Sequence, residues 1–437
     1  MNNHQDPNEK LDLKVSTPLA VQHLLAMFAS NITPAIIIAG AAGYAFGGAE
    51  MLYMIQMSMV FAGVATLMQT IGFSKVGARL PIMQGTSFAF VPVMIGIAKA
   101  AGMGAVFAST ILAGIFHFLL GFVIGKLRHL MPPLVTGLVI ISIGLALIPV
   151  GVKYAAGGVP LMGKEGFGGL NHWGLALVVI FTTLGIKFYC KGFLSTAAVL
   201  IGLLAGYIVA ALFGMVSWAK VGSASWFELP MPFVTKFDWN FDMLGFAIIG
   251  MCLISLVSAV ETVGDISGIT KGGANREASN EELEGGTMAD GLGSAVAGIF
   301  GGLPNTSFSQ NVGLIAMTGV MSRHVVTLSG IFLIICGLIP KIGAIISSMP
   351  IAVLGGGVIV MFGMVISAGL KMLVDINMNR RNMIIIAVSL SVGLGLQTVP
   401  QALQHLPASV SMLLSTGLLP VAVISIALNA LMPEESE

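Results

Sequence analysis

Residues 303–319 read LPNTSFSQNVGLIAMTG and place a dense cluster of amide and hydroxyl side chains between apolar neighbours. A lipid bilayer tolerates such groups only where they are paired or face a cavity. Pro304 disfavours helix just before itself, and the polar residues that follow it bond readily to local backbone. We therefore predict that residues 304–310 are extended rather than helical. The rest of the chain decides whether they lie in a membrane.

The composition of the whole chain is typical of a polytopic membrane protein. Hydrophobic residues make up 56% of its 437 residues, charged residues make up 9%, and the mean hydropathy is +0.96. Soluble domains carry about 25% charged residues, and no polar stretch here is long enough to build one. A formal net charge of +1 offers no basic surface for a nucleic acid. We expect an all-α protein that contacts membrane lipid and binds no nucleic acid.

The N-terminal stretch and the cysteines add little to this class assignment. Residues 1–15 are polar over too long a stretch for a signal peptide, which predicts a cytosolic tail. The spacing of Cys190, Cys252 and Cys336 suits neither a disulfide framework nor a metal site. We expect no metal and no cofactor.

Hydrophobic segments can be counted because a spanning helix needs about 20 apolar residues. Cutting the chain at polar or Gly/Pro-rich breaks gives fourteen segments. The third and the tenth are irregular, because polar residues interrupt each of them. The predicted limits are 16–43, 49–72, 80–99, 104–127, 132–151, 171–189, 192–216, 240–266, 286–302, 306–320, 323–347, 349–373, 380–398 and 407–431.

The two irregular segments resemble each other. LPIMQGTSFAF begins at Leu80 and LPNTSFSQ begins at Leu303, and both contain Thr-Ser-Phe, at 86–88 and 306–308. Because each half of the chain holds seven segments, an odd number, the two halves must face opposite ways. This pattern predicts an inverted repeat whose paired broken helices mark the substrate site. We expect the extended stretch to pair with residues 84–88 near the middle of the bilayer.

The orientation follows from lysines and arginines in the connections. With the N-terminus inside, fourteen of the 20 basic residues fall on the inner side and six on the outer side. The excess supports an even number of crossings. It predicts a multi-pass membrane protein with both termini in the cytosol. We expect this membrane to be the plasma membrane, the inner membrane of a bacterium.

Three carboxyl groups fall at membrane depth away from the long loops: Glu261, Asp265 and Asp290. Glu261 and Asp265 are four residues apart and share one helical face, and Asp290 is expected to open the ninth segment. An intramembrane carboxyl is a functional candidate by default. A carboxyl removed from water holds a proton more readily and releases it when water enters, which would allow proton coupling. The alternative is a structural role, with each group tied to neighbouring backbone or hydroxyl groups.

The irregular segments add the remaining chemistry of the expected site. Half-helix N-termini there carry partial positive charge, and Phe88 and Phe308 offer flat apolar faces, although packing is an alternative role for Phe88. The amide of Gln310 and the carboxyl of Glu261 can bond to the edge of a ligand. His23 lies in a first segment that is polar along its length, although a lone helical histidine is more often structural. The arrangement suits a small, planar, polar heterocycle.

Together these motifs resemble the nucleobase–ascorbate transporter family. QNVGLIAMTG is similar to the family signature, which is glutamine-asparagine-x-glycine-x-x-x-x-threonine followed by glycine, arginine or lysine. ETVGDISG resembles the stretch with the substrate-binding glutamate, ADG the ninth-helix aspartate motif, QHLLAM the first-helix histidine motif, and GTSFAF the element whose aromatic residue stacks on the base. The matching positions, which span nearly the whole chain in order, are Gln310, Asn311, Gly313, Thr318, Gly319, Glu261, Asp290, His23 and Phe88.

The resemblance implies fourteen helices in two inverted repeats of seven. A core domain would carry the substrate and a gate domain would form the interface of a homodimer, with proton symport typical of bacterial members. The implied parts are a cytosolic tail over 1–15, core over 16–130 and 240–347, gate over 131–239 and 348–431, and a tail over 432–437.

The residue at position 310 bears on the substrate. Uracil carriers of this family have glutamate there, whereas carriers of oxidised purines resemble this chain in having Gln310. A primary amide matches an adjacent C=O and N–H on xanthine or uric acid. The chain departs from many members at Val312, where they carry a second asparagine, and Ser87 is a small residue at a position that varies among purine carriers. Both positions leave the choice between the two purines open.

The resulting prediction is a proton-coupled symporter that imports xanthine, uric acid or both. The alternatives are an anion exchanger of the same seven-plus-seven fold, a uracil permease, and an intramembrane enzyme. For the enzyme we find neither a His-Glu-x-x-His motif nor a Gly-x-Ser-x-Gly elbow. The predicted substrate-binding residues are Glu261, Gln310, Phe88, Ser87, Phe308 and Ser309, and the predicted proton-coupling or supporting residues are Asp290, Asp265, His23, Asn311 and Thr318.

Overall fold

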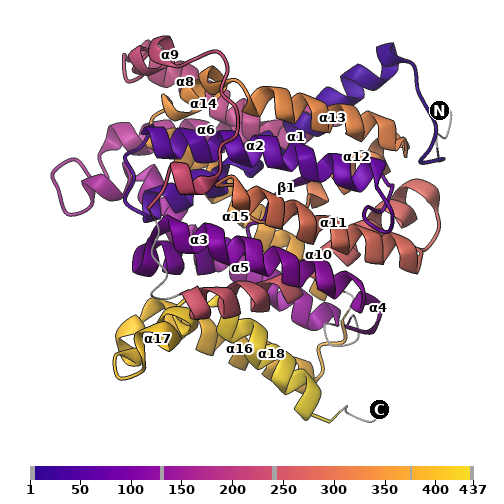
Figure 1. The fold of residues 1–437 in the computed structure, drawn as a ribbon. Coiled ribbons are helices and arrows are strands. Elements are labelled where there is room, and N and C mark those ends of the chain that lie inside the picture. The colour runs from indigo at the N-terminus through magenta and orange to yellow at the C-terminus, as the bar shows by residue number, and fades with distance from the viewer. Residues whose placement is uncertain (1–4, 128–131, 239–243, 375, 434–437) are drawn as a thin grey trace.

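A computed structural model describes residues 5–127, 132–238, 244–374 and 376–433 of the chain (Figure 1). The expected domain boundaries at 130–131 and 239–240 lie outside the described residues, as do the outer parts of the two expected tails, 1–4 and 434–437. The first turn of α1 and the last turn of α18 lie on the same side of the molecule (Figure 1).

The first half of the chain is helical apart from one short strand. Its third long helix, α3, is broken at Gly102, whose φ of 77° is open to glycine but strained for other residues. The elements are α1 (Leu13–Ala41), α2 (Ala49–Ile71), β1 (Gln84–Thr86), α3 (Val91–Gly121), α4 (Ile124–Leu127), α5 (Pro133–Ala155), η2 (Val159–Leu161), α6 (Leu170–Tyr189), α7 (Phe193–Thr196), α8 (Ala198–Leu212), α9 (Ala219–Ser223) and η3 (Phe233–Thr235).

The second half repeats this order. It has a long helix, a second helix, a strand and a shorter helix before the next long helices. The elements are α10 (Leu244–Ala274), α11 (Asn280–Ile299), β2 (Asn305–Ser307), α12 (Ser309–Thr318), α13 (Arg323–Gly337), α14 (Pro340–Ser347), α15 (Ile351–Leu373), α16 (Arg380–Thr398), η4 (Pro400–Leu403), α17 (Ala408–Leu414) and α18 (Leu418–Leu431).

The two halves of the chain are interleaved, so that helices of the first half pack against helices of the second half. Helix α2 packs along α13, and α3 packs along α11, so the second helix of each half contacts the helix that follows the broken segment of the other half, which is α13 in the second half and the part of α3 beyond Gly102 in the first. Small residues allow the approach: a Cβ added at Gly63 would lie 2.5 Å from the Gly330 carbonyl oxygen, and one at Gly291 would lie 2.1 Å from the Phe118 nitrogen. This reciprocal packing is the contact pattern of an inverted repeat.

Packing also sorts the long helices into two groups. The strand-bearing group consists of α1, α2, α3, α10, α11, α12 and α13 with both strands. The second group, called here the α5–α15 group, is built on the extensive contact between those two helices and includes α6, α7, α8, α16 and α18. Contacts such as α1 with α8 and α10 with α5 join the groups.

The helices follow the predicted segments closely. Within the described residues, eight helices are long and apolar enough to cross a membrane, or ten crossings if each of the bent pairs α13–α14 (77°) and α17–α18 (76°) counts as one. The difference from fourteen has physical causes. Helix α3 covers two predicted segments, α8 and α12 are short, and the 20-residue α11 carries four carboxyl groups.

Two sequence predictions about element ends are wrong. Asp290 does not open a helix, because α11 begins ten residues earlier, at Asn280, behind a capping box between Ser279 and Glu282. The extended stretch does not reach residue 310, because α12 already begins at Ser309.

Candidate functional site

The two short strands pair with each other in the interior of the strand-bearing group. They pair antiparallel, with Gln84 opposite Ser307 and Thr86 opposite Asn305. The ladder continues on both sides, from Ser87 N to the Pro304 carbonyl (2.8 Å) and from Phe308 N to the Met83 carbonyl (3.0 Å). The predicted pairing is therefore confirmed for 84–87, and the backbone freed by breaking two helices is satisfied without water. Phe88 does not take part.

A cavity of about 440 Å³ lies between the two helix groups, beside the paired strands. The strand-bearing group contributes polar residues to its wall, whereas the α5–α15 group contributes mostly apolar ones. The lining residues include Ser30, Thr86, Phe88, Glu261, Thr306, Ser307, Phe308, Ser309, Gln310 and Gly313 from the first group, and Ile140, Ile143, Lys187, Thr196, Val199, Leu200, Met361, Met364, Val365 and Ala368 from the second.

Glu261 and Gln310 meet at this cavity. Glu261 lies on α10 and is partly exposed, and Gln310 lies in the first turn of α12 and is also partly exposed. Neither side chain forms a hydrogen bond or ion pair with another residue in the part of the chain that the structure describes. A carboxyl and a primary amide are thus free to bond to a ligand from two different helices.

Asp265, one turn beyond Glu261, is turned away from the cavity and is 8% exposed. Its carboxylate accepts hydrogen bonds from the Ser307 hydroxyl (2.6 Å) and the Ser309 hydroxyl (2.7 Å). These bonds tie α10 to strand β2 and to the first turn of α12. Asp265 therefore holds the residues that present Gln310, and it has no free oxygen aimed at the cavity.

Asp290 is fully buried inside the strand-bearing group. One carboxylate oxygen accepts from the Gln69 amide (2.7 Å) and the Gln84 amide (2.6 Å), and the other accepts from the Thr262 hydroxyl. The donors come from α2, β1 and α10, so Asp290 joins three elements around strand β1. Charged hydrogen bonds of this kind are strong in a dry interior.

His23 and Asn311 contact each other behind α12. The Asn311 amide lies 3.0 Å from His23 Nδ1 and donates to the His23 carbonyl, also at 3.0 Å. Both residues are buried, and neither lines the cavity. Thr318 donates to the Leu314 carbonyl within α12 (2.8 Å) and also lies off the cavity. These three residues hold α12 in place rather than face a ligand.

Both aromatic residues predicted at the site lie on the cavity wall, but the neighbouring Ser87 does not. Phe88 is half-buried on the cavity wall, with its ring edge-on to Phe362 at 5.4 Å between centroids. Phe308 also lines the cavity but is only 5% exposed. Ser87 is fully buried away from the cavity, and its hydroxyl finds no hydrogen-bond partner among the described residues. The structure thus brings together Glu261, Gln310, Phe88, Phe308 and Ser309 but not Ser87.

Buried amides near the site were missed by the sequence prediction. Asn31 accepts from the Thr86 backbone N–H (2.8 Å) and donates to the Ser58 carbonyl (3.0 Å), fixing strand β1 against α1 and α2. Gln69 and Gln84 donate hydrogen bonds to Asp290. The sequence does contain a signal for these residues, because an amide side chain inside an apolar segment needs a buried hydrogen-bond partner.

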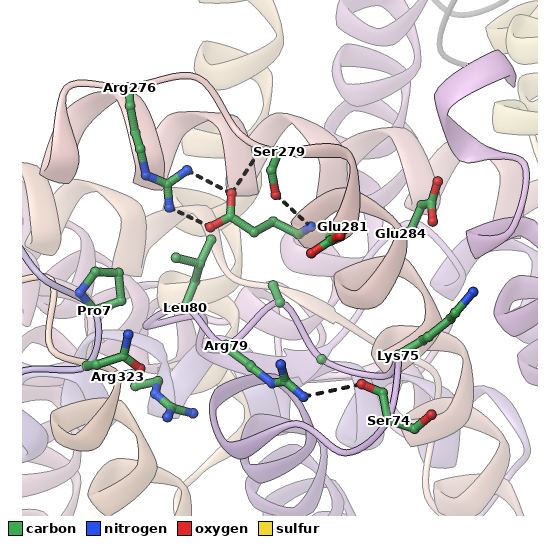
Figure 2. Close-up of a pocket in the computed structure, with 14 residues that line it drawn as sticks. Pro7, Ser74, Lys75, Arg79, Leu80, Arg276, Ser279, Glu281, Glu284 and Arg323 are labelled. Carbon is green, nitrogen blue, oxygen red and sulfur yellow. Dashed lines mark hydrogen bonds and ion pairs between the residues drawn. The ribbon is translucent and has the colours of Figure 1, made fainter.

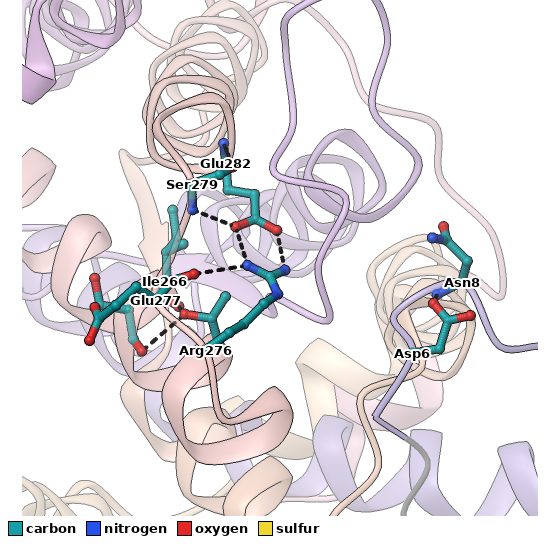
Figure 3. A network of polar contacts seen from close by, with 9 residues as sticks. Asp6, Asn8, Ile266, Arg276, Glu277, Ser279 and Glu282 are labelled. Atoms are coloured by element: carbon teal, nitrogen blue, oxygen red, sulfur yellow. Dashed lines mark hydrogen bonds and ion pairs between the residues drawn. The ribbon is translucent and has the colours of Figure 1, made fainter.

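A larger cavity of about 900 Å³ lies at the end of the strand-bearing group, between the α2–β1 connection and the α10–α11 connection (Figure 2). Its wall is highly charged, and its charges are partly paired. Arg276 grips the Glu282 carboxylate with both Nη atoms, at 2.8 and 2.5 Å (Figure 3). Burial acts to raise the pKa of Glu282, but the bonds from Arg276 and Ser279 outweigh it, and the pKa lies below its ordinary value. This cavity has the character of a solvated loop junction.

Comparison with known proteins agrees with this geometry. A family model described as "Permease family" matches residues 15–402. The uric acid permease PucJ of Bacillus subtilis is 38% identical over 424 residues, which cover 96% of this chain and 93% of PucJ. The xanthine permease of the same organism is 35% identical over 418 residues, which cover 94% of this chain and 92% of that protein.

Solved structures extend the comparison to the fold. The transmembrane domain of the cyanobacterial bicarbonate transporter BicA superposes with a TM-score of 0.64 at 16% identity, covering 96% of this chain and all of that one. At this identity the likeness shows the fold alone, which is that of the seven-plus-seven transporters. The predicted family resemblance is confirmed by the sequence matches. The chain therefore belongs to the xanthine/uracil permease family, the nucleobase–ascorbate transporters, and is a multi-pass membrane transporter of the nucleobase class rather than an enzyme.

Proposed function

We propose that this protein imports an oxidised purine, xanthine or uric acid, across the plasma membrane in symport with protons. The observation that carries the proposal is the meeting of an unpartnered carboxyl, an unpartnered amide and an aromatic ring at the 440 Å³ cavity between two helix groups. The similarity to xanthine and uric acid permeases, which extends over nearly the whole chain, supports the substrate class.

The proposed contacts follow from the chemistry of each wall residue. Gln310 donates one hydrogen bond and accepts another, which matches a neighbouring carbonyl and N–H of the purine. Glu261 accepts from ring N–H groups. Phe88 stacks on the purine face, and Phe308 and Ser309 bound the same pocket. Asp265, Asp290, His23, Asn311 and Thr318 support these residues, and Ser87 acts through strand β1.

The proposed transport cycle moves the two helix groups relative to each other. The strand-bearing group would be the core domain, over 16–130 and 240–347, and the α5–α15 group the gate domain, over 131–239 and 348–431. Both tails would be cytosolic, with fourteen crossings as two inverted repeats of seven, and gate domains would pair in a homodimer. The ligand would travel with the core while the gate stays fixed.

The proposed coupling site is Glu261. It is the cavity carboxyl whose hydrogen-bond capacity is left to water and ligand, so its proton can exchange when the cavity is wet. Closure with the purine bound would remove water and hold the proton in place. Substrate and proton would then cross together.

The test is uptake of labelled xanthine, uric acid, uracil and sulfate by cells that express the chain, with and without a protonophore. We expect uptake of xanthine or uric acid that collapses when the proton gradient is removed. Sulfate uptake without purine uptake would favour an anion exchanger, and uracil uptake alone would favour a uracil permease. Either result would overturn the proposal.

A further inference from the structure

Lys187 is a charged residue on the face of the α5–α15 group that turns toward the cavity. Among the described residues that line the cavity, Glu261 and Lys187 are the charged ones, and they come from opposite helix groups. Lys187 forms no ion pair or hydrogen bond with another described residue. The ammonium group is thus left for water or for a ligand.

The position of Lys187 on α6 follows the inward stripe of that helix. The buried residues of α6 include Ala176, Val179 and Thr183, and Lys187 continues their spacing of three and four residues. The next two residues face outward, because Phe188 is 80% exposed and Tyr189 is 90% exposed. The last turn of a helix suits a basic side chain, but the inward direction of this lysine, along a stripe of buried residues, places its charge at the cavity.

A function for this lysine follows from the charges of the ligand and of Glu261. Uric acid is mainly an anion at neutral pH, and xanthine is a weaker acid that is mainly neutral in slightly acidic solution. Until Glu261 takes up its proton, its carboxylate repels a purine anion that enters the same cavity. An ammonium across the same cavity offsets it, and it does so only for the charged ligand.

We propose that Lys187 is a specificity residue that allows this cavity to accept the anionic form of an acidic heterocycle. The inference rests on the proposed function and extends it to the charge of the substrate. Because Lys187 belongs to the opposite helix group from Glu261, its contribution exists only while the two groups enclose the ligand in this arrangement.

The test compares three variants of the full chain in proteoliposomes, at a slightly acidic pH where uric acid is mainly ionised and xanthine mainly neutral. For Lys187→Gln we expect the KM for uric acid to rise about tenfold, with the KM for xanthine nearly unchanged. Lys187→Arg keeps the charge and should retain uric acid uptake. Lys191→Gln removes an exposed charge four residues further along and should leave both substrates unaffected.

The outcomes separate this inference from its alternatives. Equal loss of both substrates in Lys187→Gln would show a structural role and overturn the inference, as would no change in either. The same loss in Lys191→Gln would show a general surface charge effect and also overturn it. Absence of uptake of both purines by the unmodified chain would instead overturn the proposed function, and the inference with it.

Discussion

The cavity wall and the interior of the strand-bearing group both hold a carboxyl group, but in opposite settings. Asp290 is 0% exposed and accepts from Gln69, Gln84 and Thr262. Glu261 faces the cavity, and none of the described residues donates a hydrogen bond to its carboxyl group. A buried carboxyl is tolerated when its oxygens are satisfied. Where the protein supplies the donors, the carboxyl group can serve the packing of the fold, and where the protein does not supply them, water or a ligand can.

The strongest test of this contrast is Glu261→Gln. We expect uptake of xanthine and uric acid to fall by at least about a hundredfold, because a charge-assisted contact and the proton carrier are both lost. The amount of folded protein in the membrane should be unchanged. Initial uptake rates and a thermal unfolding curve of the purified protein measure the two effects.

A matched control for this substitution is Glu281→Gln, which removes an exposed carboxyl from the first turn of α11. It should leave uptake at the level of the unmodified chain. Normal uptake by well-expressed Glu261→Gln would show that Glu261 does not bind the substrate, and the proposed difference in role between Glu261 and Asp290 would be wrong.

A smaller effect is expected for Gln310→Glu, which places a second carboxyl on the cavity wall. The donor half of the amide is lost unless the new carboxyl is protonated. One mismatched buried contact costs about 1–3 kcal/mol, which lowers xanthine affinity by roughly tenfold to a hundredfold. Competition binding over a range of pH measures it. Affinity equal to that of the unmodified chain at every pH would show that position 310 does not contact the purine.

Asp290→Asn tests the other side of the contrast. An amide in place of the carboxylate turns an NH2 group toward donors, and we expect a loss of about 1–3 kcal/mol in the free energy of unfolding. Substrate binding per folded molecule should stay within about threefold of normal, with proton-driven accumulation impaired more than binding. Thermal unfolding, binding and accumulation are measured on the same preparation. Binding lost as fully as in Glu261→Gln, at unchanged stability, would contradict a supporting role.

The smallest expected effect concerns Ser307 and Ser309, two donors to the same carboxylate. Ser309 is exposed at the cavity, whereas Ser307 is 2% exposed. Ser309→Cys should react several-fold faster with a small polar thiol reagent than Ser307→Cys, and substrate should slow the reaction at residue 309. The rates are read by mass spectrometry. Lack of reaction at both positions in every condition would show that the cavity is closed to water.

The sequence allowed much of this architecture to be predicted. The approximate positions of most helices followed from apolar length, and the strand pair followed from the repeated Leu-Pro and Thr-Ser-Phe motifs. Glu261, Gln310 and Phe88 stood out because chemistry at membrane depth is rare. These features are local or periodic, so a linear reading of the chain can find them.

The errors arose where local signals conflicted or partners were distant. Hydropathy placed the start of the ninth segment after the acidic loop, although the Ser-x-x-Glu pattern at Ser279–Glu282 already marked an earlier helix start. Asp290 is bonded to residues 206 and 221 positions away, and no local pattern specifies such partners. Lys187 escaped notice because it was counted as a charge in a connection rather than as part of a helical stripe.

The reciprocal packing of the two halves has a consequence for biosynthesis. Helix α2 leaves the ribosome early, but its partner α13 ends at Gly337, and strand β1 waits for Asn305–Ser307. Gln69 and Gln84 therefore enter the bilayer long before Asp290 exists to accept their bonds. The strand-bearing group therefore cannot complete its packing until the second half has also entered the membrane, late in translation.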